Sequence, residues 1–346
     1  MALCALHVNS VRRIHLLLDH YGSAREAWKH EGEGANAALQ KAYKELDFIH
    51  QHQIAIFDYT HSDYPDRLRQ CPDAPLILYG KGNIHPNGGK FISIVGTRAA
   101  SERGKEFTRQ LVLDLAQKVS NVTIVSGLAF GVDVAAHRAA LEAGISTIIV
   151  PAHGLDRIYP PLHRQVAVDA LENGGILTEY MSGTEPERFN FVARNRIIAG
   201  MADAVVVVES RAKGGSLITA QMACDYDRSL FAVPGRPNDL NSRGCNELIR
   251  NQKAALIESA DDLVLQMQWE EESVPVQTKM ADLLVDLNED EKRLLQILRT
   301  AEDGVHINSL VMEAGLDYAS TASSLMMMEM NGLVKSLPGG MYRSVG

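Results

Sequence analysis

The sequence predicts an α/β fold with a doubly wound, mostly parallel sheet at its centre. Between residues 91 and 268, short apolar, β-branched runs alternate with stretches of helical periodicity, and the apolar runs lack the polar alternation of a half-exposed strand. Strands that are buried on both faces and joined by helices form a parallel sheet with right-handed crossovers. The 346 residues, 46% of them hydrophobic, are enough for two or three domains.

The predicted elements of this central region alternate along the chain. Strands are expected at 91–96, 122–126, 147–151, 176–179, 204–209, 230–233 and 255–257. Helices are expected at 102–119, 132–143, 163–173, 190–200, 216–226 and 245–251. In such a sheet, ligands bind at the carboxyl ends of the strands, near the point where the strand order reverses.

Residues 1–58 show helical spacing and are predicted to form a small N-terminal helical domain. A helix–hairpin–helix DNA module is an alternative, but His7-Val8-Asn9-Ser10 stands where a glycine-containing hairpin would donate amides to phosphate, so a packing or interaction cap is favoured. Residues 59–268 are predicted to form one extended α/β domain. Its first part, 59–90, contains prolines and one short strand.

A charged linker at 269–287 and a winged-helix domain at 288–346 complete the predicted organisation. The third helix of this tail, expected at 317–330, contains no Lys or Arg, and the tail carries five basic against eight acidic residues. Such a surface attracts duplex DNA poorly, so a protein-interaction or structural role is favoured over DNA reading. The run Leu325-Met326-Met327-Met328 is expected in the core rather than on an adaptable apolar surface.

Overall charge and cysteine usage exclude several classes of protein. The net charge of −9 argues against nonspecific coating of nucleic acid, so any phosphate site must be a local patch. The four cysteines show no paired spacing and predict neither disulfides nor a zinc site. The sequence has no apolar run of about 18 residues and no signal-peptide pattern, so a cytoplasmic protein without membrane contact is expected.

The first predicted strand ends at a glycine and leads through a short polar loop into a helix. This geometry presents backbone N–H groups and the positive end of a helix dipole to an anion, most often a phosphate. Arg98 adds a planar set of donors that suits phosphate oxygens. The alternative to a phosphate site is that Gly96 only turns the chain and that Arg98 is a solvated loop residue.

Further polar or glycine-rich segments follow the other strand ends. Several such turns in one domain are moderate support for a phosphate-bearing ligand, and residues 188–250 carry nine Lys or Arg against six Asp or Glu, a basic island on an acidic chain. The segments are Gly96-Thr97-Arg98 with Ser101, Ser126-Gly127 through Asp133, Gly154 through Pro160, Arg194-Asn195-Arg196, and Lys213-Gly214-Gly215-Ser216.

The sequence contains no candidate nucleophile with a neighbouring base, so no enzyme is predicted. No metal site and no cofactor are predicted either. Asp133 and His137 lie four residues apart without a third ligand, which favours a helix-start carboxylate and a packed histidine. The loop at Gly96 matches neither the Walker pattern nor the dinucleotide fingerprint. Ser126 and Ser216 lack the strained elbow of an esterase.

Six ordered motifs resemble those of the DNA-processing protein A family (DprA, also called Smf). The resemblance covers the whole central domain and extends upstream to Tyr64-Pro65 and downstream into the tail. The motifs are Gly96-Thr97-Arg98-x-x-Ser101, Val125 through His137, Gly154-Leu155-Asp156-x-x-Tyr159-Pro160, Phe191-x-x-Arg194-Asn195-Arg196, Gly215 through Ala220, and Val233-Pro234-Gly235.

The resemblance implies a bacterial protein with a Rossmann-like domain that binds single-stranded DNA, without catalysis. It further implies protection of incoming strands in natural transformation, delivery of those strands to the RecA recombinase, and a homodimer. Carried over by motif, Gly96, Thr97, Arg98 and Ser101 would hold a backbone phosphate, together with Gly127 and Arg194-Asn195. Tyr159 would flank the phosphate and stack on a base.

The chain departs from the family pattern at two positions. Some relatives carry a basic residue where this chain has Phe130, and again where it has Pro161. Arg157 or Arg164 is a candidate to replace that charge. The residues expected to flank the strand are therefore Phe130, Tyr159, Arg157, Arg164, Lys213 and Ser216.

Two alternatives remain open at this point. One is an enzyme acting on a nucleoside monophosphate, because phosphoribohydrolases share a Rossmann-like fold with a glycine-rich phosphate loop similar to Lys213-Gly214-Gly215-Ser216. That enzyme needs a catalytic glutamate, for which Glu179 or Glu209 could be nominated, although the rest of the pattern does not fit. The other is a scaffold whose glycine loops are only structural.

Overall fold

The computed structural model describes residues 1–6, 11–269, 288–299, 304–330, 333–337 and 339–344. The chain divides into two compact units, Met1–Glu272 and Ser273–Gly346. The segment His7-Val8-Asn9-Ser10 and nearly all of the predicted linker lie outside the described residues. Whether residues 1–58 form a domain of their own stays a prediction.

The described part of the first unit contains a nine-stranded sheet in the order β1-β2-β6-β5-β4-β3-β7-β8-β9. The seven strands from β3 to β9 are parallel, and β1 and β2 are antiparallel additions at one edge. The order reverses at β3, whose neighbours are β4 and β7. The strands are β1 Ala55–Asp58, β2 Ile77–Gly82, β3 Lys90–Val95, β4 Val122–Ser126, β5 Ser146–Ile149, β6 Gly174–Thr178, β7 Ala204–Val207, β8 Ser229–Ala232 and β9 Ala255–Leu256.

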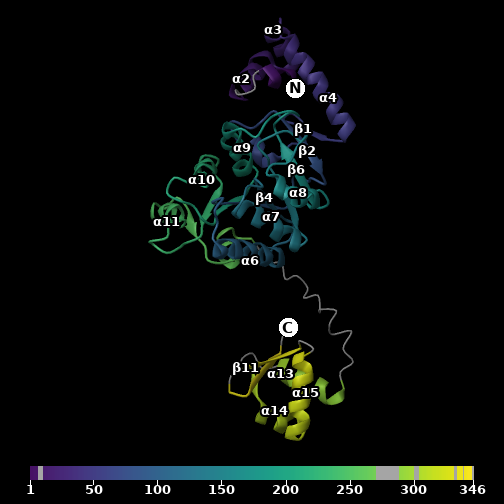
Figure 1. The fold of residues 1–346 in the computed structure, drawn as a ribbon, viewed down its shortest axis with the longest axis vertical. Helices are drawn as coiled ribbons and strands as arrows, with labels where there is room; N and C mark the ends of the chain where they lie inside the picture. Colours follow the sequence, from purple (N-terminus) through teal and green to yellow (C-terminus); the bar gives the residue numbers. More distant parts are fainter. Residues whose placement is uncertain (7–10, 270–287, 300–303, 331–332, 338, 345–346) are drawn as a thin grey trace. The chain divides into compact units, whose positions relative to one another are not determined.

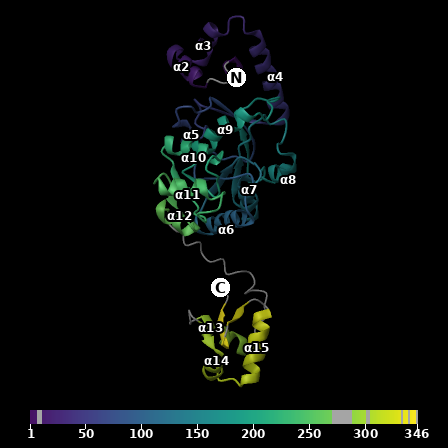
Figure 2. The ribbon, with the colours of Figure 1, turned by 60° about the vertical axis from the view of Figure 1, so that its left-hand side comes forward.

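Helices cover both faces of this sheet, so the doubly wound prediction is confirmed (Figures 1 and 2). One face packs against α6 Glu102–Lys118, α7 Val132–Glu142 and α12 Ala260–Gln266. The other packs against α5 Asp66–Arg69, α9 Arg188–Gly200, α10 Ser216–Asp225 and α11 Arg243–Arg250. A 3₁₀ turn, Pro161–His163, and α8 Arg164–Asp169 follow β5.

Strand β3 shows why its apolar run has no polar alternation. Phe91 and Val95 belong to the core cluster on one face, whereas Ile92 and Ile94 belong to the cluster on the other. The hydroxyl of Ser93 is buried and donates to the carbonyl of Ile198 at 2.6 Å, which satisfies the one polar side chain at the centre of the strand.

The N-terminal residues form four helices, α1 Ala2–Leu6, α2 Val11–Tyr21, α3 Ala24–Glu31 and α4 Asn36–His52. The expectation of helices throughout 1–58 was incomplete, because Ala55–Asp58 forms β1, which pairs antiparallel with β2. A four-residue strand has too little periodic signal to be recognised without its partner. Helix α4 contacts the loop that follows β6: the buried Glu45 carboxylate accepts from the amide and hydroxyl of Ser182 at 2.9 and 2.5 Å.

The second unit has three helices and a small sheet in its described part, and the winged-helix prediction is confirmed by its match to a winged-helix family model. Its sheet has the order β10-β12-β11. The expected core position of the methionine run was half wrong, because Leu325 and Met328 are buried but Met326 and Met327 are exposed on the opposite helix face. The elements are α13 Glu289–Arg299, β10 Val305–His306, α14 Ile307–Ala314, α15 Tyr318–Met330, β11 Val334–Leu337 and β12 Met341–Ser344.

Candidate functional site

Loops from three adjacent strands meet at the carboxyl edge of the sheet, where the strand order reverses. The loop after β3 is tied to the end of β7, because the amide of Thr97 donates to the carbonyl of Glu209 at 2.8 Å. It is also tied to the start of α7, because Val132 N donates to Thr97 O at 3.4 Å. Gly131 permits this approach: its φ is +81°, and a Cβ there would lie 2.2 Å from Thr97 O. The three loops therefore form one fixed surface.

A buried arginine lies beneath these loops. Arg194 is only 3% exposed, and its guanidinium donates to the carbonyl of Val150 at the end of β5. Gly127 makes room for it, since a Cβ at that position would lie 2.2 Å from Arg194 Nη1. Within the described part of the chain, the buried Arg194 Nε has no hydrogen-bond partner. Arg69 and Arg228 also have a buried Nε without a partner among the described residues, so Arg194 is distinguished by its position beneath the loops rather than by the unpaired atom alone.

The charges around Arg194 are only partly balanced. Burial lowers the pKa of Arg194 to about 10, and the nearby Asp133 carboxylate offsets part of that shift. Burial also raises the pKa of Asp133, although Arg194 and the amide of Ala129, 3.4 Å away, favour its charged form. In both groups desolvation exceeds the mutual attraction, yet Arg194 stays protonated at neutral pH. An anion bound at the loops would stabilise this buried cation further.

An exposed arginine and two aromatic rings lie above the buried one. The guanidinium of Arg98 lies 5.0 Å from the centroid of the Phe191 ring, and the guanidinium of Arg194 lies 5.9 Å from the same centroid. The ring of Tyr159, 42% exposed, lies 6.0 Å from Phe191. Arg98 makes no ion pair within the described residues. Within the described ranges, the arrangement thus offers a guanidinium that is not ion-paired beside a flat aromatic face, which can take a phosphate and a stacked base.

Two buried histidines position the neighbouring aromatic side chains. His153 Nε2 accepts from the amide of Tyr159 at 3.2 Å, and burial lowers the pKa of His153, so the ring is neutral and free to accept. His163 Nδ1 lies 2.8 Å from the carbonyl of Leu128, and its ring packs edge-on against Phe130 at 4.8 Å. Phe130 is 42% exposed, so it extends the aromatic surface on the side of the loop after β4.

A protein carboxylate occupies the N-terminus of α6. The amide of Ser101 donates to Glu209 Oε2 at 2.9 Å, and its hydroxyl donates to Glu209 Oε1 at 2.5 Å. The same hydroxyl accepts from Gly104 N at 3.0 Å, which makes Ser101 the N-cap residue. Ser101 is thus bonded within the protein, and the helix dipole that the sequence assigned to a phosphate is complemented by Glu209. A phosphate contact from Ser101 stays a prediction.

The other predicted site residues differ in how available they are. Asn195 is half-buried beside Arg194 on α9, and Lys213 and Arg164 are exposed at the starts of α10 and α8. The structure brings Gly96, Thr97, Arg98, Gly127, Tyr159 and Arg194 to one edge, whereas a contact from Asn195 stays a prediction. Ser216 is buried and donates to Ser210 Oγ at 2.9 Å. Arg157 forms ion pairs with Asp156, at 2.9 Å, and with Glu185, so its charge is balanced locally.

Three residues that shape this surface were not predicted as site residues: Phe191, which was named only within a motif, Glu209, which was considered only as a catalytic glutamate, and His153. Phe191 was detectable, because it precedes Arg194 by three residues and shares a helix face with it. No local sequence pattern indicated that Glu209 caps α6 or that His153 accepts a hydrogen bond from the amide of Tyr159.

The described residues contain no group of three His, Cys, Asp or Glu side chains placed to hold a metal ion. His137 is buried, with Nδ1 2.7 Å from Thr147 Oγ1, and Asp133 lies in the first turn of α7. No helix within the described ranges is long and apolar enough to cross a membrane.

The fold and this edge define a class: a Rossmann-like α/β protein with a cationic and aromatic surface at the switch point of its sheet. The model of the DNA recombination-mediator protein A family matches residues 55–268, and that of the DprA winged helix domain matches residues 278–340. The chain belongs to the DNA recombination-mediator protein A family.

Individual relatives agree with this assignment. Protein Smf from Synechocystis is 35% identical, with 81% of this chain and 78% of that protein covered. DNA processing protein DprA from Streptococcus pneumoniae is 35% identical, covering 67% of this chain and 83% of that protein. The solved structure of the latter matches with a TM-score of 0.59 at 37% identity, covering 66% and 81%. The structure of DNA processing protein A from Helicobacter pylori, described for its single-stranded DNA binding mode, matches with a TM-score of 0.56 at 30% identity, covering 62% and 96%.

Proposed function

We propose that the protein binds single-stranded DNA at the carboxyl edge of its sheet. The observation that supports this most directly is the exposed Arg98 guanidinium, stacked 5.0 Å from Phe191 above the buried, incompletely bonded Arg194. A backbone phosphate contacts Arg98 and the loop Gly96-Thr97, and a neighbouring base stacks on Tyr159. The description of the Helicobacter pylori relative as a single-stranded DNA binder supports the same ligand.

The proposal includes the role of the bound strand. The protein protects incoming single strands in natural transformation and DNA recombination and loads the RecA recombinase onto them, acting as a homodimer in the cytoplasm. The family description, a recombination mediator, supports this role. The net charge of −9 is compatible with it, because the cations that contact DNA gather at one edge rather than over the whole surface.

No chemical step is part of the proposal. Glu179, one candidate for the glutamate of a phosphoribohydrolase, is held by Arg196, whose Nη2 donates to Glu179 Oε2 at 2.6 Å. Glu209, the other candidate, is held by Ser101. A carboxylate that already accepts strong hydrogen bonds from the protein is a poor general base, which favours binding over catalysis.

The decisive experiment compares Arg98→Ala with wild type for binding to oligo-dT. Loss of a charged hydrogen bond of about 1.5–3 kcal/mol weakens binding by roughly tenfold or more. The slope of log affinity against log salt becomes shallower by about one, because one fewer counterion is released. Arg138→Ala is the matched control, since Arg138 is also exposed but lies on α7 away from the loops. Equal affinities of wild type and Arg98→Ala at moderate salt contradict the proposal, as does a flat salt response of the wild type.

A further inference from the structure

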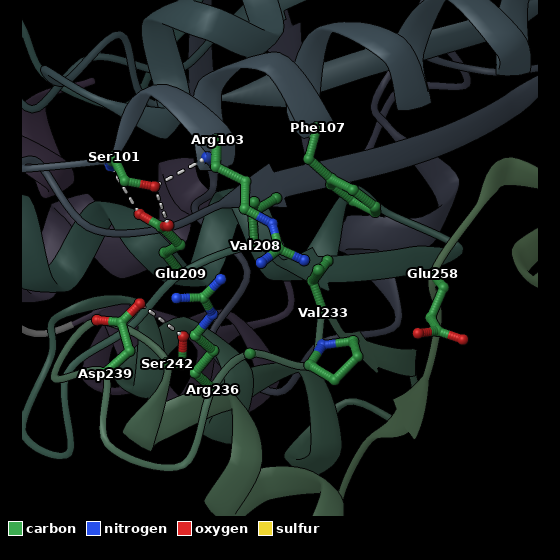
Figure 3. Close-up of a pocket in the computed structure, with 13 residues that line it drawn as sticks. Ser101, Arg103, Phe107, Val208, Glu209, Val233, Arg236, Asp239, Ser242 and Glu258 are labelled. Carbon is green, nitrogen blue, oxygen red and sulfur yellow. Dashed lines mark hydrogen bonds between the residues drawn. The ribbon is translucent and has the colours of Figure 1, made fainter.

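A cavity opens at the carboxyl edge, between the first turn of α6 and the loop that follows β8. Its volume is about 460 Å³, within the range of small-ligand sites (Figure 3). Its lining includes Ser101 and Glu209, which were described above, but none of Arg98, Phe191 and Tyr159 lines it. The two sites are nevertheless adjacent, because Asn241, in the loop after β8, donates to the carbonyl of Ala99 at 3.1 Å.

Two arginines reach into this cavity from opposite walls. Figure 3 shows Arg103, from the first turn of α6, and Arg236, from the loop after β8, turning their guanidinium groups toward the same space. Neither guanidinium has an ion-pair or hydrogen-bond partner in the part of the chain that the structure describes. Several other arginines in the unit are paired, for example Arg67 with Asp203 at 2.6 Å. Two like charges that face one space without a direct ion pair attract an anion into it.

Three carboxylates also line the cavity, and none of them forms an ion pair with either arginine among the described residues. Glu209 is bonded to the amide and hydroxyl of Ser101. Asp239 accepts from the amide of Asn241 at 2.9 Å and from the hydroxyl of Ser242 at 3.2 Å. Glu258 lies on the side of the cavity away from Ser101 (Figure 3). Glu209 and Asp239 keep their negative charges, but hydrogen bonds hold both carboxylates to other groups, so the two guanidinium groups are the charged groups left to contact a ligand.

Specific hydrogen bonds hold the wall that carries Arg236. Gly235 N donates to Asn246 Oδ1 at 3.1 Å, and Asn246 Nδ2 donates back to Gly235 O at 2.9 Å. A Cβ at Gly235 would lie 1.9 Å from Ser242 Oγ, so any larger residue there would have to displace the Ser242 side chain. The wall is preformed rather than a loose loop, which lowers the entropy that a ligand must lose on binding.

We propose that this cavity binds a nucleotide, with its phosphate between Arg103 and Arg236 and its base against the apolar wall. That wall contains Phe107, Val208, Val233 and Pro234. A phosphate alone would need only the two cations, whereas the apolar surface next to them fits a flat heterocycle as well. The nucleotide is either free in solution or part of the strand bound at Arg98; the second source rests on the proposed function.

The test measures binding of AMP to the full chain by equilibrium dialysis. Arg103→Gln and Arg236→Gln are each expected to weaken AMP binding by about tenfold, since each removes a charged contact to the phosphate. Arg250→Gln, an exposed arginine of α11 outside the cavity, is the matched control and binds AMP as the wild type does. Adenosine binds more weakly than AMP, and thermal unfolding midpoints show that the variants stay folded.

Two arms separate the sources of the nucleotide. If oligo-dT displaces AMP, the bound strand occupies the cavity; if AMP and oligo-dT bind together, the ligand is a free nucleotide. Arg98→Ala retains AMP binding in either case, so failure of the DNA-binding proposal does not remove this result. The inference is overturned if the wild type does not bind AMP, or if Arg103→Gln and Arg236→Gln bind it as well as Arg250→Gln does.

Discussion

Replacement of Gly127 by alanine tests the packing on which the whole site depends. The new Cβ would lie 2.2 Å from Arg194 Nη1 and 2.6 Å from Arg194 Cζ. Ordinary van der Waals contact begins at 3.4 Å, so the guanidinium must move by about 1 Å. Arg194 is buried and donates to Val150 O, which leaves it no solvent into which to move.

The expected loss of unfolding free energy follows from two structural consequences of the substitution. Overpacking of a buried site costs about 1–3 kcal/mol, and weakening a charged hydrogen bond costs up to about 1.5–3 kcal/mol. Because both arise from one displacement they are not additive, and we expect the free energy of unfolding to fall by about 2–4 kcal/mol. Urea unfolding of the full chain, followed by a signal from the first unit, measures this loss. Oligo-dT binding should weaken as well, since Phe191 packs against the displaced guanidinium.

Gly215→Ala is the matched control for this variant. Gly215 has φ −62° and ψ −29°, which alanine adopts without strain, and no atom lies within 4 Å of a Cβ built there. Its free energy of unfolding should equal that of wild type or rise slightly. If Gly127→Ala is as stable as Gly215→Ala and binds oligo-dT normally, the position of Arg194 does not depend on the space at Gly127, and the packing proposed for this site is refuted.

Two further predictions concern buried ionisable groups. Glu179→Gln should lower the free energy of unfolding by about 3 kcal/mol, because it removes the carboxylate that is hydrogen-bonded to the buried Arg196 and leaves only Asp73, 3.8 Å from Arg196 Nε, and no loss in urea unfolding would contradict that pairing. Burial lowers the pKa of His137 to about 3, so stability should fall as the pH drops from about 6.5 toward 3, because the unfolded chain binds a proton that folded His137 does not. The variant His137→Gln should show a shallower pH dependence in the same assay, and an identical dependence would contradict this assignment.

The alternation of apolar runs and helical periods was sufficient to predict the central sheet. Each predicted parallel strand is present, from β3 at Lys90–Val95 to β9 at Ala255–Leu256, with boundaries shifted by one to two residues in most cases. The signal is strong because strands that are buried on both faces must be apolar along their whole length. Strand β1 was missed because its stability comes from pairing with β2, a contact that periodicity does not report.

The candidate site was predictable for residues whose position depends only on the neighbouring strand or turn. Arg98 follows the end of a strand, and Gly127 and Gly131 lie in a turn, so their positions at the carboxyl edge follow from sequence alone. The capping of α6 was not predictable. A strand–turn–helix pattern exposes amides that suit a phosphate. In the structure, however, the amide and hydroxyl of Ser101 donate to the carboxylate of Glu209, which lies more than one hundred residues further along the chain.

The sequence by itself therefore determined the fold class, the winged-helix tail and the edge at which the cationic and aromatic side chains gather, because periodicity and turn chemistry are local properties. Only the tertiary structure decided which charges are free. Pairing of β7 with β3 brings Glu209 to the N-terminus of α6, and the fold buries Arg194 while it leaves Arg98, Arg103 and Arg236 without carboxylate partners among the described residues. Whether a charge is available to a ligand depends on its neighbours in space, and these are set by strand order rather than by position along the chain.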